Sequence, residues 1–267
     1  MNSPVSSPTP NPPSGMPPIE AVDLKEYGAP KQGQTQVSNK RLFFQLHVFT
    51  GCHSHDALVS AVQGSGLEAV LYASLSDPRG IGILTFSEDP AVFTTTARKL
   101  LSSGLFSALT LCPEFTMTGR TYAAGREPDL EDWLLHKPRR NALNKDLKWA
   151  VWYPLRRKPE FELLSKDEQT KILYEHAKIG MAYGMSGFAH DIRLACHGLD
   201  KNDNEFVLGV VAPELFPISR LVQDMRKTQQ TGRYMQSMGP FFVGKVLYQT
   251  PLKPSSGAHT SVPPAMN

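Results

Sequence analysis

Two stretches of the chain, far apart in the sequence, repeat one local pattern, and this repeat limits the folds that the chain can adopt. Residues Gly82–Pro90 lead into a helix that ends near Leu101, and residues Gly209–Phe216 lead into a helix that ends near Lys227. Each unit is a strand, an acidic or proline-containing helix start and an amphipathic helix. Because strands and helices also interleave around each unit, we predict an α+β fold of two ferredoxin-like halves that form a β-barrel.

The periodicity of the apolar residues predicts where these elements lie. Alternating apolar and polar residues indicate strands. Apolar residues spaced three and four positions apart, in segments that begin at a helix-start signal and end at a glycine, indicate helices. A capping box, Ser165-x-x-Glu168, marks the start of a helix that runs to about residue 183. Strands are expected at 41–49, 69–75, 81–86, 109–122, 147–153, 192–197, 206–211 and 241–248, and the other helices at 57–63, 90–101 and 213–227.

The two ends of the chain differ from the middle in composition. Eight of the 22 prolines fall in residues 1–30 and four in residues 251–267. Such segments bury too little apolar surface to offset the entropy lost on ordering, so we expect residues 1–40 and 251–267 to be disordered tails. Residues 41–135 are then the N-terminal ferredoxin-like half and residues 136–250 the C-terminal half.

The overall composition excludes several classes of protein. The 28 basic and 25 acidic residues give a net charge of +3, too balanced to suggest non-specific nucleic-acid binding, and no cluster of basic residues alternates with aromatic ones. No run of apolar residues is long enough to span a membrane. The three cysteines form no CxxC motif, which excludes zinc ribbons and covalent c-type haem. The N-terminus has no signal-peptide pattern, and free thiols suit a reducing compartment, so we expect a cytoplasmic protein.

His176 is the first residue with a candidate chemical role. It shares one helix face with Ile172, Ile179 and Tyr183, so its imidazole lies on the buried side of that helix. A histidine in such a place is often a hydrogen-bonded core residue. A neutral imidazole on an apolar helix face is also what a haem iron needs on its proximal side.

Arg193 is the second candidate. Strand alternation places it with His197 on the face opposite Ile192, Leu194 and Cys196. One interpretation is an exposed strand face or an ion pair with Asp191 or Asp200. The other is an arginine that faces a dry pocket and stabilises charge during cleavage of an O–O or Cl–O bond.

Tyr153 is the third candidate and ends a buried strand face, before Pro154. Arg156, Arg157 and Lys158 follow directly. Such a basic triplet is often an ordinary solvated turn. Alternatively, the phenol lies beside cations that hold a ligand with several carboxylates.

Together these segments resemble the chlorite dismutase family, which includes the peroxide-dependent coproheme decarboxylases. The segment from Glu175 to Gly180 is similar to the family segment that carries the proximal haem histidine, which assigns His176 to the iron. The stretch from Tyr153 to Arg157 resembles a decarboxylase motif in which the tyrosine is catalytic and a lysine, here Arg157, binds a propionate. The resemblance covers most of residues 41–250.

The resemblance also implies further site residues. Arg226 and Thr231 match positions that approach haem carboxylates, and Arg139 is expected to hold another carboxylate. Chlorite dismutases have an arginine on the distal side of the haem and the decarboxylases have a glutamine or histidine there. We assign the distal position to Arg193, with His190 as the alternative. The tyrosine therefore favours one branch of the family and the arginine the other.

The resemblance implies a haem-dependent oxidoreductase, with haem b or coproheme as its iron porphyrin, that assembles as a ring-shaped homo-oligomer, a pentamer. The first hypothesis is peroxide-dependent decarboxylation of coproheme to haem b, in which Tyr153 and Arg193 are catalytic. The alternatives are decomposition of chlorite to chloride and dioxygen, a haem peroxidase, or a haem-binding protein without catalytic activity.

Overall fold

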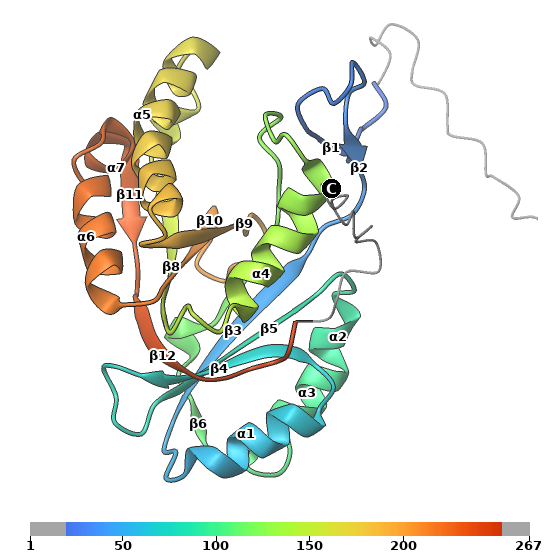
Figure 1. Cartoon of the computed structure of the whole chain (residues 1–267), viewed down its shortest axis with the longest axis vertical. Helices are drawn as coiled ribbons and strands as arrows, with labels where there is room; N and C mark the ends of the chain where they lie inside the picture. The colour runs from blue at the N-terminus through green and yellow to red at the C-terminus, as the bar shows by residue number, and fades with distance from the viewer. Residues whose placement is uncertain (1–19, 253–267) are drawn as a thin grey trace, which may run out of the picture.

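A computed structural model describes residues 20–252 of the chain, and ten strands in this range form one antiparallel sheet. The sheet is built from two βαββαβ units, each accompanied by its helices (Figure 1). The first unit comprises β3 (Phe43–Thr50), α1 (His55–Gly64), β4 (Glu68–Ser74), β5 (Ile81–Ser87), α2 (Ala91–Thr94), α3 (Thr96–Leu101) and β7 (Met117–Arg120). The second comprises β8 (Trp149–Arg157), α5 (Lys166–Met185), β9 (His190–Ala195), β10 (Phe206–Ala212), α6 (Leu215–Met225), α7 (Gln229–Tyr234), β11 (Met235–Met238) and β12 (Phe242–Gln249).

The strand pairings close on themselves, which confirms the predicted α+β class with two ferredoxin-like halves. The order β10-β9-β7-β3-β5-β4-β12-β8 returns to its start because β8 also pairs with β10. One junction between the halves, β4 with β12, is extensive, whereas β7 and β9 meet at the single pair Arg120 and Ala195. Between the halves lie the π-helical turn η3 (Asp132–His136) and helix α4 (Lys137–Leu143).

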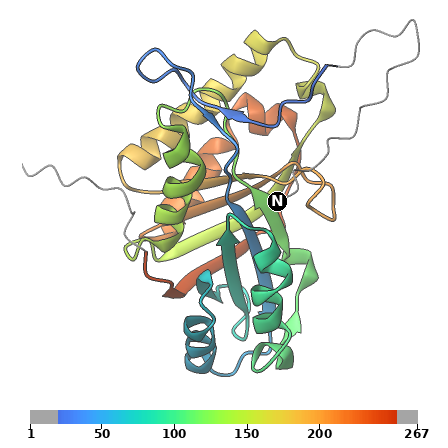
Figure 2. The same ribbon diagram turned by 90° about the vertical axis from the view of Figure 1, so that its right-hand side faces the viewer.

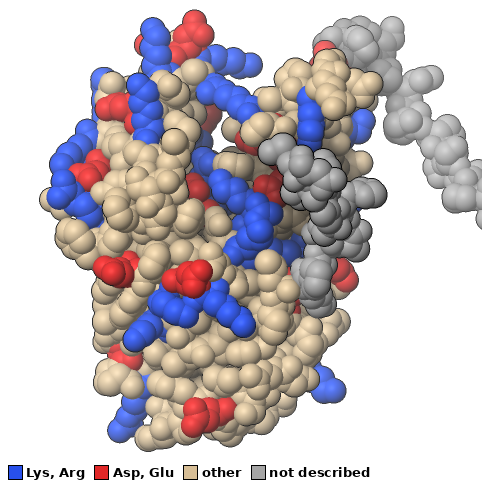
Figure 3. Space-filling view, in the orientation of Figure 1, with Lys and Arg blue, Asp and Glu red and all other residues tan. Residues whose placement is uncertain are grey.

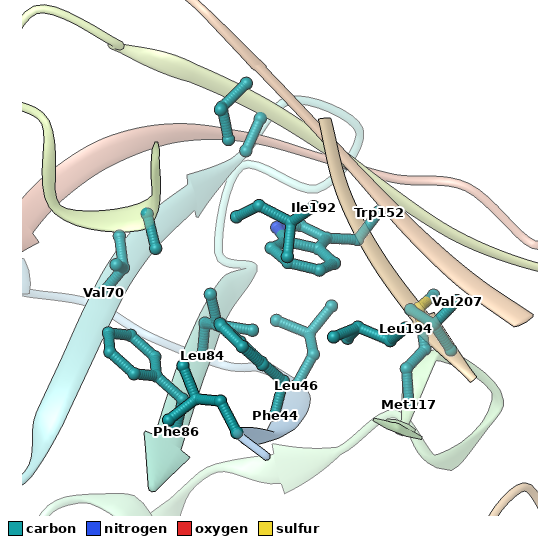
Figure 4. Close-up of a cluster of buried hydrophobic side chains, with 14 of the residues drawn as sticks. Phe44, Leu46, Val70, Leu84, Phe86, Met117, Trp152, Ile192, Leu194 and Val207 are labelled. Carbon is teal, nitrogen blue, oxygen red and sulfur yellow. The ribbon is translucent and has the colours of Figure 1, made fainter. Parts of the chain in front are cut away.

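The interior of this ring of strands is a single apolar core to which both halves contribute. Phe44, Leu84 and Phe86 of the first half face Trp152, Ile192 and Leu194 of the second (Figure 4). Helices cover the outer faces. In two views α1 and α3 lie at one end of the molecule and α5 and α6 at the other (Figures 1 and 2). Ile218 and Leu221 of α6 pack on the outward-facing Val151 and Val210 of β8 and β10.

Two glycines allow aromatic rings to fill this interior. A Cβ atom at Gly209 would lie 2.5 Å from the Trp152 ring, and one at Gly82 would lie 2.4 Å from the Phe242 ring. Both glycines stand at the start of the repeated unit identified in the sequence. Each unit therefore has a strand position without a side chain that an aromatic ring covers, from the adjacent strand β8 at Gly209 and from β12, the next strand but one, at Gly82.

Strand β8 differs from its prediction, because Pro154 does not end it. The strand continues to Arg157, and Pro154 pairs in register with Val207. The carbonyl of Pro154 accepts a hydrogen bond from the Gly239 N–H, at the break between β12 and β11. The N–H that proline lacks would point to the same break, so its loss costs the sheet no hydrogen bond.

Other segments also differ from prediction. The helix expected at 90–101 is divided into α2 and α3 at Thr95, whose φ and ψ of −117° and −91° are not helical. The extended stretch at 109–122 is divided into β6 (Thr110–Leu111), the 3-10 turn η2 (Pro113–Phe115) and β7. The remaining 3-10 turns are η1 (Phe106–Ala108) and η4 (Pro159–Phe161).

The segment expected to be an N-terminal tail is ordered in part. Strands β1 (Glu26–Tyr27) and β2 (Val37–Ser38) pair, and Glu26 accepts a hydrogen bond from Arg120 at 3.2 Å. Residues 1–19 and 253–267, the rest of the two predicted tails, lie outside the described residues. The boundaries 41–135 and 136–250 for the two halves stay a prediction.

We predict that Gly209→Ala lowers the free energy of unfolding by about 1–3 kcal/mol, because the new methyl group must displace the Trp152 ring in a packed interior. Gly64→Ala is the matched control, since a Cβ atom there meets no other atom within 4 Å. Urea unfolding of both variants measures the difference. Equal stability of the two variants would contradict this account of Gly209.

Candidate functional site

The register of three strands places a row of side chains on the outer face of the second half. Leu208 of β10 pairs with Tyr153 of β8 on one side and with Arg193 of β9 on the other. Paired residues of antiparallel strands lie on the same face, so these three side chains leave the sheet together. The next position along each strand faces the barrel interior, where Trp152 and Ile192 lie in the core.

Tyr153 is a buried phenol in this row. Its ring stacks on Phe241 with centroids 4.5 Å apart, and 4% of the residue is exposed. Burial raises the pKa of Tyr153 well above that of a free phenol, with a smaller opposing effect of the Arg226 charge. The phenol is therefore neutral and keeps its proton across the physiological range.

His176 lies on helix α5, whose start is the predicted capping box. The Ser165 hydroxyl accepts a hydrogen bond from the Glu168 N–H, and the Glu168 carboxylate accepts one from the Ser165 N–H. Burial and, to a smaller extent, the charge of Arg193 lower the pKa of His176 to about 4. The imidazole is neutral at neutral pH, the state in which a histidine binds a metal.

Thr228 decides which nitrogen of His176 carries the proton. His176 Nδ1 lies 3.1 Å from Thr228 Oγ1, and this hydroxyl donates to the Met225 carbonyl at 2.8 Å. Because the hydroxyl proton is used there, Thr228 accepts from His176, which assigns the proton to Nδ1. Nε2 then keeps its lone pair, in the arrangement typical of a metal-binding histidine held by an outer hydrogen bond.

The sequence reasoning did not single out Thr228. The residue is 2% exposed and is also the N-cap of α7, where its Oγ1 accepts from the Thr231 N–H. A threonine directly before Gln229-Gln230 is a helix-start signal, so its capping role was readable from the sequence. Its contact with a histidine 52 positions earlier was not. Thr231 is brought to the same place by this cap.

Arg193 reaches the same space from the sheet. Its Nε lies 2.9 Å from an Asp191 carboxylate oxygen, and its guanidinium lies 4.7 Å above the Trp133 ring of η3. The first alternative of the sequence analysis is confirmed, because Arg193 is 43% exposed and ion-paired with Asp191. A role of Arg193 in charge stabilisation stays a prediction, although its charge adds to the effect of burial in lowering the pKa of His176.

A hollow in the surface lies between α5 and α4, and basic side chains gather on its α4 side (Figure 3). A small cavity of about 20 Å³, the room of a single water, is lined by Tyr122, Trp133, Lys137, Asp191 and Arg193. A second, larger cavity of about 620 Å³ lies between the end of α5 and the start of α6, with Phe188 and Phe216 in its wall. Of the predicted site residues, Arg193 lines the first cavity.

Arg157 and Arg226 differ in how their charges are used. Arg157 is ion-paired with Glu162 at 2.8 Å and Glu205 at 3.0 Å. Its guanidinium also lies over two aromatic rings. Arg226 forms no ion pair with any carboxylate in the described part of the chain, and its guanidinium lies 3.9 Å from a methionine sulfur. Arg226 is therefore a cation near Tyr153 that is available to an outside carboxylate.

Two predicted residues are not brought to this face. Arg139 binds Glu68 and Glu88, each at 3.1 Å, beside β4 and the end of β5, so its charge is satisfied within the first half. His190, the alternative to Arg193, pairs with Val211, a residue of the barrel interior, and so belongs to the opposite face of β9.

No cluster of three or more histidine, cysteine, aspartate or glutamate side chains suited to a metal ion is found within residues 20–252. No helix in this range has the length and apolar character needed to cross a membrane.

The lowered pKa of His176 predicts a dependence of stability on pH for the protein without ligand. The unfolded chain takes up a proton near pH 6.5 and the folded chain only near pH 4, so stability falls as the pH drops through this window. The loss is roughly 3 kcal/mol at most. Urea unfolding between pH 4 and 8 of the wild type and His176→Gln measures it. Burial also lowers the pKa of His47, which contributes equally to the pH dependence of both proteins. The test is therefore the difference between the two curves of stability against pH, and parallel curves would contradict the prediction for His176.

Comparison with known proteins bears on this site. The model of the chlorite dismutase family matches residues 64–247. The coproheme decarboxylase of Oceanobacillus iheyensis is 33% identical over 107 residues, an alignment that covers 38% of this chain and 41% of that protein.

Solved structures share the fold at low sequence identity. A putative chlorite dismutase, TA0507, is 15% identical with a TM-score of 0.62, over 78% of this chain and 96% of its own. A heme-binding protein from Thermus thermophilus is 17% identical with a TM-score of 0.63, over 78% and 94%. A mutant chlorite dismutase from Candidatus Nitrospira defluvii has a TM-score of 0.59 at 15% identity, over 78% and 92%. Since the family model spans well over half of the sequence, the chain belongs to the chlorite dismutase family.

Proposed function

We propose that this chain binds an iron porphyrin through His176 and catalyses the peroxide-dependent decarboxylation of coproheme to haem b. The observation that carries the proposal is the position of Tyr153, a buried phenol on the sheet face against which the helix of His176 packs. Arg226, which has no ion pair among the described residues, places its charge near this phenol. A decomposition of chlorite needs no such phenol, because chlorite carries no carboxylate to oxidise.

The residues present fit an iron porphyrin. His176 is neutral, its proton lies on Nδ1, and its Nε2 lone pair is free for the iron. The facing row is apolar at Leu208 and polar at its two ends, which suits a flat apolar ring with polar substituents. Arg226, Thr231 and Arg157 are the groups that would hold its carboxylates, although Arg157 must share its charge with Glu162 and Glu205. Arg139 has no part in this proposal.

Peroxide is the oxidant, and the bound iron porphyrin would transmit its oxidising equivalents. The protein positions the reacting groups and supplies the charges around them. Conversion of a propionate to a vinyl group releases carbon dioxide, a proton and an electron pair, and peroxide takes up an electron pair and protons as it becomes water. Tyr153 is the group that accepts electrons from the propionate side chain, one at a time. Arg226 orients that carboxylate against the phenol, and its positive charge favours the ionised form of both groups.

The proposal extends to assembly and location. The family resemblance supports a ring-shaped homo-pentamer, and the three cysteines are free thiols, which suits a reducing compartment such as the cytoplasm. Light scattering on the haem-loaded protein measures the subunit number.

We predict that His176→Ala abolishes tight binding of iron porphyrin, because it removes the imidazole whose Nδ1–H is held by Thr228 and whose Nε2 lone pair is free for the iron. Thr228→Val removes the acceptor for Nδ1–H and weakens iron-porphyrin affinity by about 10- to 100-fold. Thr228→Ser, which keeps the hydroxyl, is the matched control. Titration followed by the Soret absorbance measures all three. Wild-type affinity in His176→Ala would rule out His176 as the ligand.

We predict that Tyr153→Phe binds coproheme normally but loses its conversion to haem b. The Tyr153 hydroxyl has no hydrogen-bond partner among the described residues, so the cost in stability is no more than about 1 kcal/mol. Tyr72→Phe, a buried tyrosine of the barrel interior, is the matched control and should convert coproheme as the wild type does.

The assay adds peroxide to the coproheme-loaded protein and identifies the porphyrin by mass spectrometry. A Tyr153→Phe protein that makes haem b at the wild-type rate would overturn the mechanism. A wild type that leaves coproheme unchanged but evolves dioxygen from chlorite would replace the proposed function with chlorite decomposition. A Soret band unaltered by either oxidant would indicate a non-catalytic haem-binding protein.

A further inference from the structure

Asp191 lies on the same outer face of the sheet as Tyr153 and Arg193 and has no role in the proposed function. It pairs in register with Val210, which in turn pairs with Val151, so it belongs to the row next to Tyr153, Leu208 and Arg193. Its side chain therefore leaves the sheet on the same side as theirs. Among these outward-facing positions of β8, β9 and β10, Asp191 is the one carboxylate.

The charge of Asp191 acts on the groups that surround this space. Burial is the main cause of the shifted pKa values of His176, Tyr153 and Tyr122, and beyond it the Asp191 carboxylate raises the pKa of all three. The guanidinium of Arg193 acts in the opposite direction on His176 and Tyr122. Both charges of the ion pair therefore reach the region between the sheet and α5.

We infer that Asp191 is a specificity-determining residue, which neutralises Arg193 and makes the face opposite His176 selective for neutral small molecules such as peroxide over anions such as chlorite. This inference rests on the proposed iron-porphyrin site. It does not depend on whether the bound porphyrin is decarboxylated.

The physical reason is the geometry of the pair. With 2.9 Å between Arg193 Nε and Asp191 Oδ2, the two charges cancel at any distance beyond a few ångströms. A small anion that enters must compete with a covalently tethered carboxylate for the same guanidinium. A neutral peroxide meets no such competition and can still accept a hydrogen bond from the other guanidinium nitrogens.

A covering ligand strengthens this effect. The Arg193 and Asp191 side chains are 43% and 38% exposed in the chain alone, where water screens them. A porphyrin between the sheet and α5 would exclude part of that water, and charge interactions grow as the local dielectric constant falls. Lys137, the other cation of the small cavity, lies over the Trp133 ring at 4.1 Å and is unchanged in the variants below, so comparison between variants isolates Asp191.

The test measures ligand binding to the ferric haem-loaded protein and uses no oxidant. Fluoride is the anionic probe and imidazole the neutral probe, with dissociation constants taken from spectral titration at constant ionic strength. Asp191→Asn frees the guanidinium and should bind fluoride about tenfold more tightly or better, with imidazole affinity within about twofold of the wild type. Asp191→Glu keeps the charge and should behave as the wild type.

Two further variants complete the test. Asp203→Asn removes an equal charge from an exposed turn, where the φ of +57° also suits asparagine, and should leave both affinities unchanged. Arg193→Gln leaves the Asp191 carboxylate unpaired and should weaken fluoride binding about tenfold or more, which tests the inference even if Asp191→Asn fails to fold. Unchanged fluoride affinity in Asp191→Asn, or in Arg193→Gln, would overturn it.

The outcomes separate this inference from the proposed function. If the wild type does not convert coproheme but the variants show the predicted differences in fluoride affinity, the inference about Asp191 stands and the decarboxylase proposal is wrong. If the wild type converts coproheme but Asp191→Asn does not change fluoride affinity, the decarboxylase proposal stands and the inference is wrong. A wild type that binds no iron porphyrin would overturn both.

Discussion

The register of β8 against its neighbours is the constraint on which the rest of the site depends. Side chains alternate across a strand, so a slip of one residue would send Tyr153 into the barrel interior and Trp152 to the outside. The fit of the Trp152 ring over Gly209 opposes this slip, because Gly209 is the one glycine of β10 and a Cβ atom there would lie 2.5 Å from the ring. A packing contact in the core thereby decides which residues of β8, β9 and β10 face helix α5.

Much of this arrangement could be predicted from the sequence because it rests on local periodicity. The alternation of β9 placed Arg193 opposite Ile192 and Leu194, and the helical spacing of Ile172, His176 and Ile179 put the imidazole on the inner side of α5. The Ser165 and Glu168 pair marked the start of that helix. In each case residues within a few positions of one another carried the information.

Other features could not be predicted, because they depend on partners that are distant in the sequence. Glu68 and Glu88 lie 71 and 51 positions from Arg139, and nothing near Arg139 indicates that they bind it. Pro154 signals the end of a strand in isolation, and only the break between β11 and β12 beside it removes the penalty. Sequence alone could also not decide between the two interpretations of Arg193, since both ion pairing with Asp191 and exposure to the site follow from one face of one strand.

The hydrogen bond between Thr228 and His176 links ligand binding at the imidazole to the order of helix α7. Its hydroxyl oxygen is at once the acceptor for His176 Nδ1–H and the cap of α7, and α7 leads directly into β11, which pairs with β8 beyond Tyr153. A ligand that draws electron density from Nε2 makes Nδ1–H a stronger donor and tightens the bond to that oxygen. Occupancy at His176 and order in residues 228–238 are thus linked functions, and linkage is reciprocal: whatever loosens this segment also weakens what His176 holds.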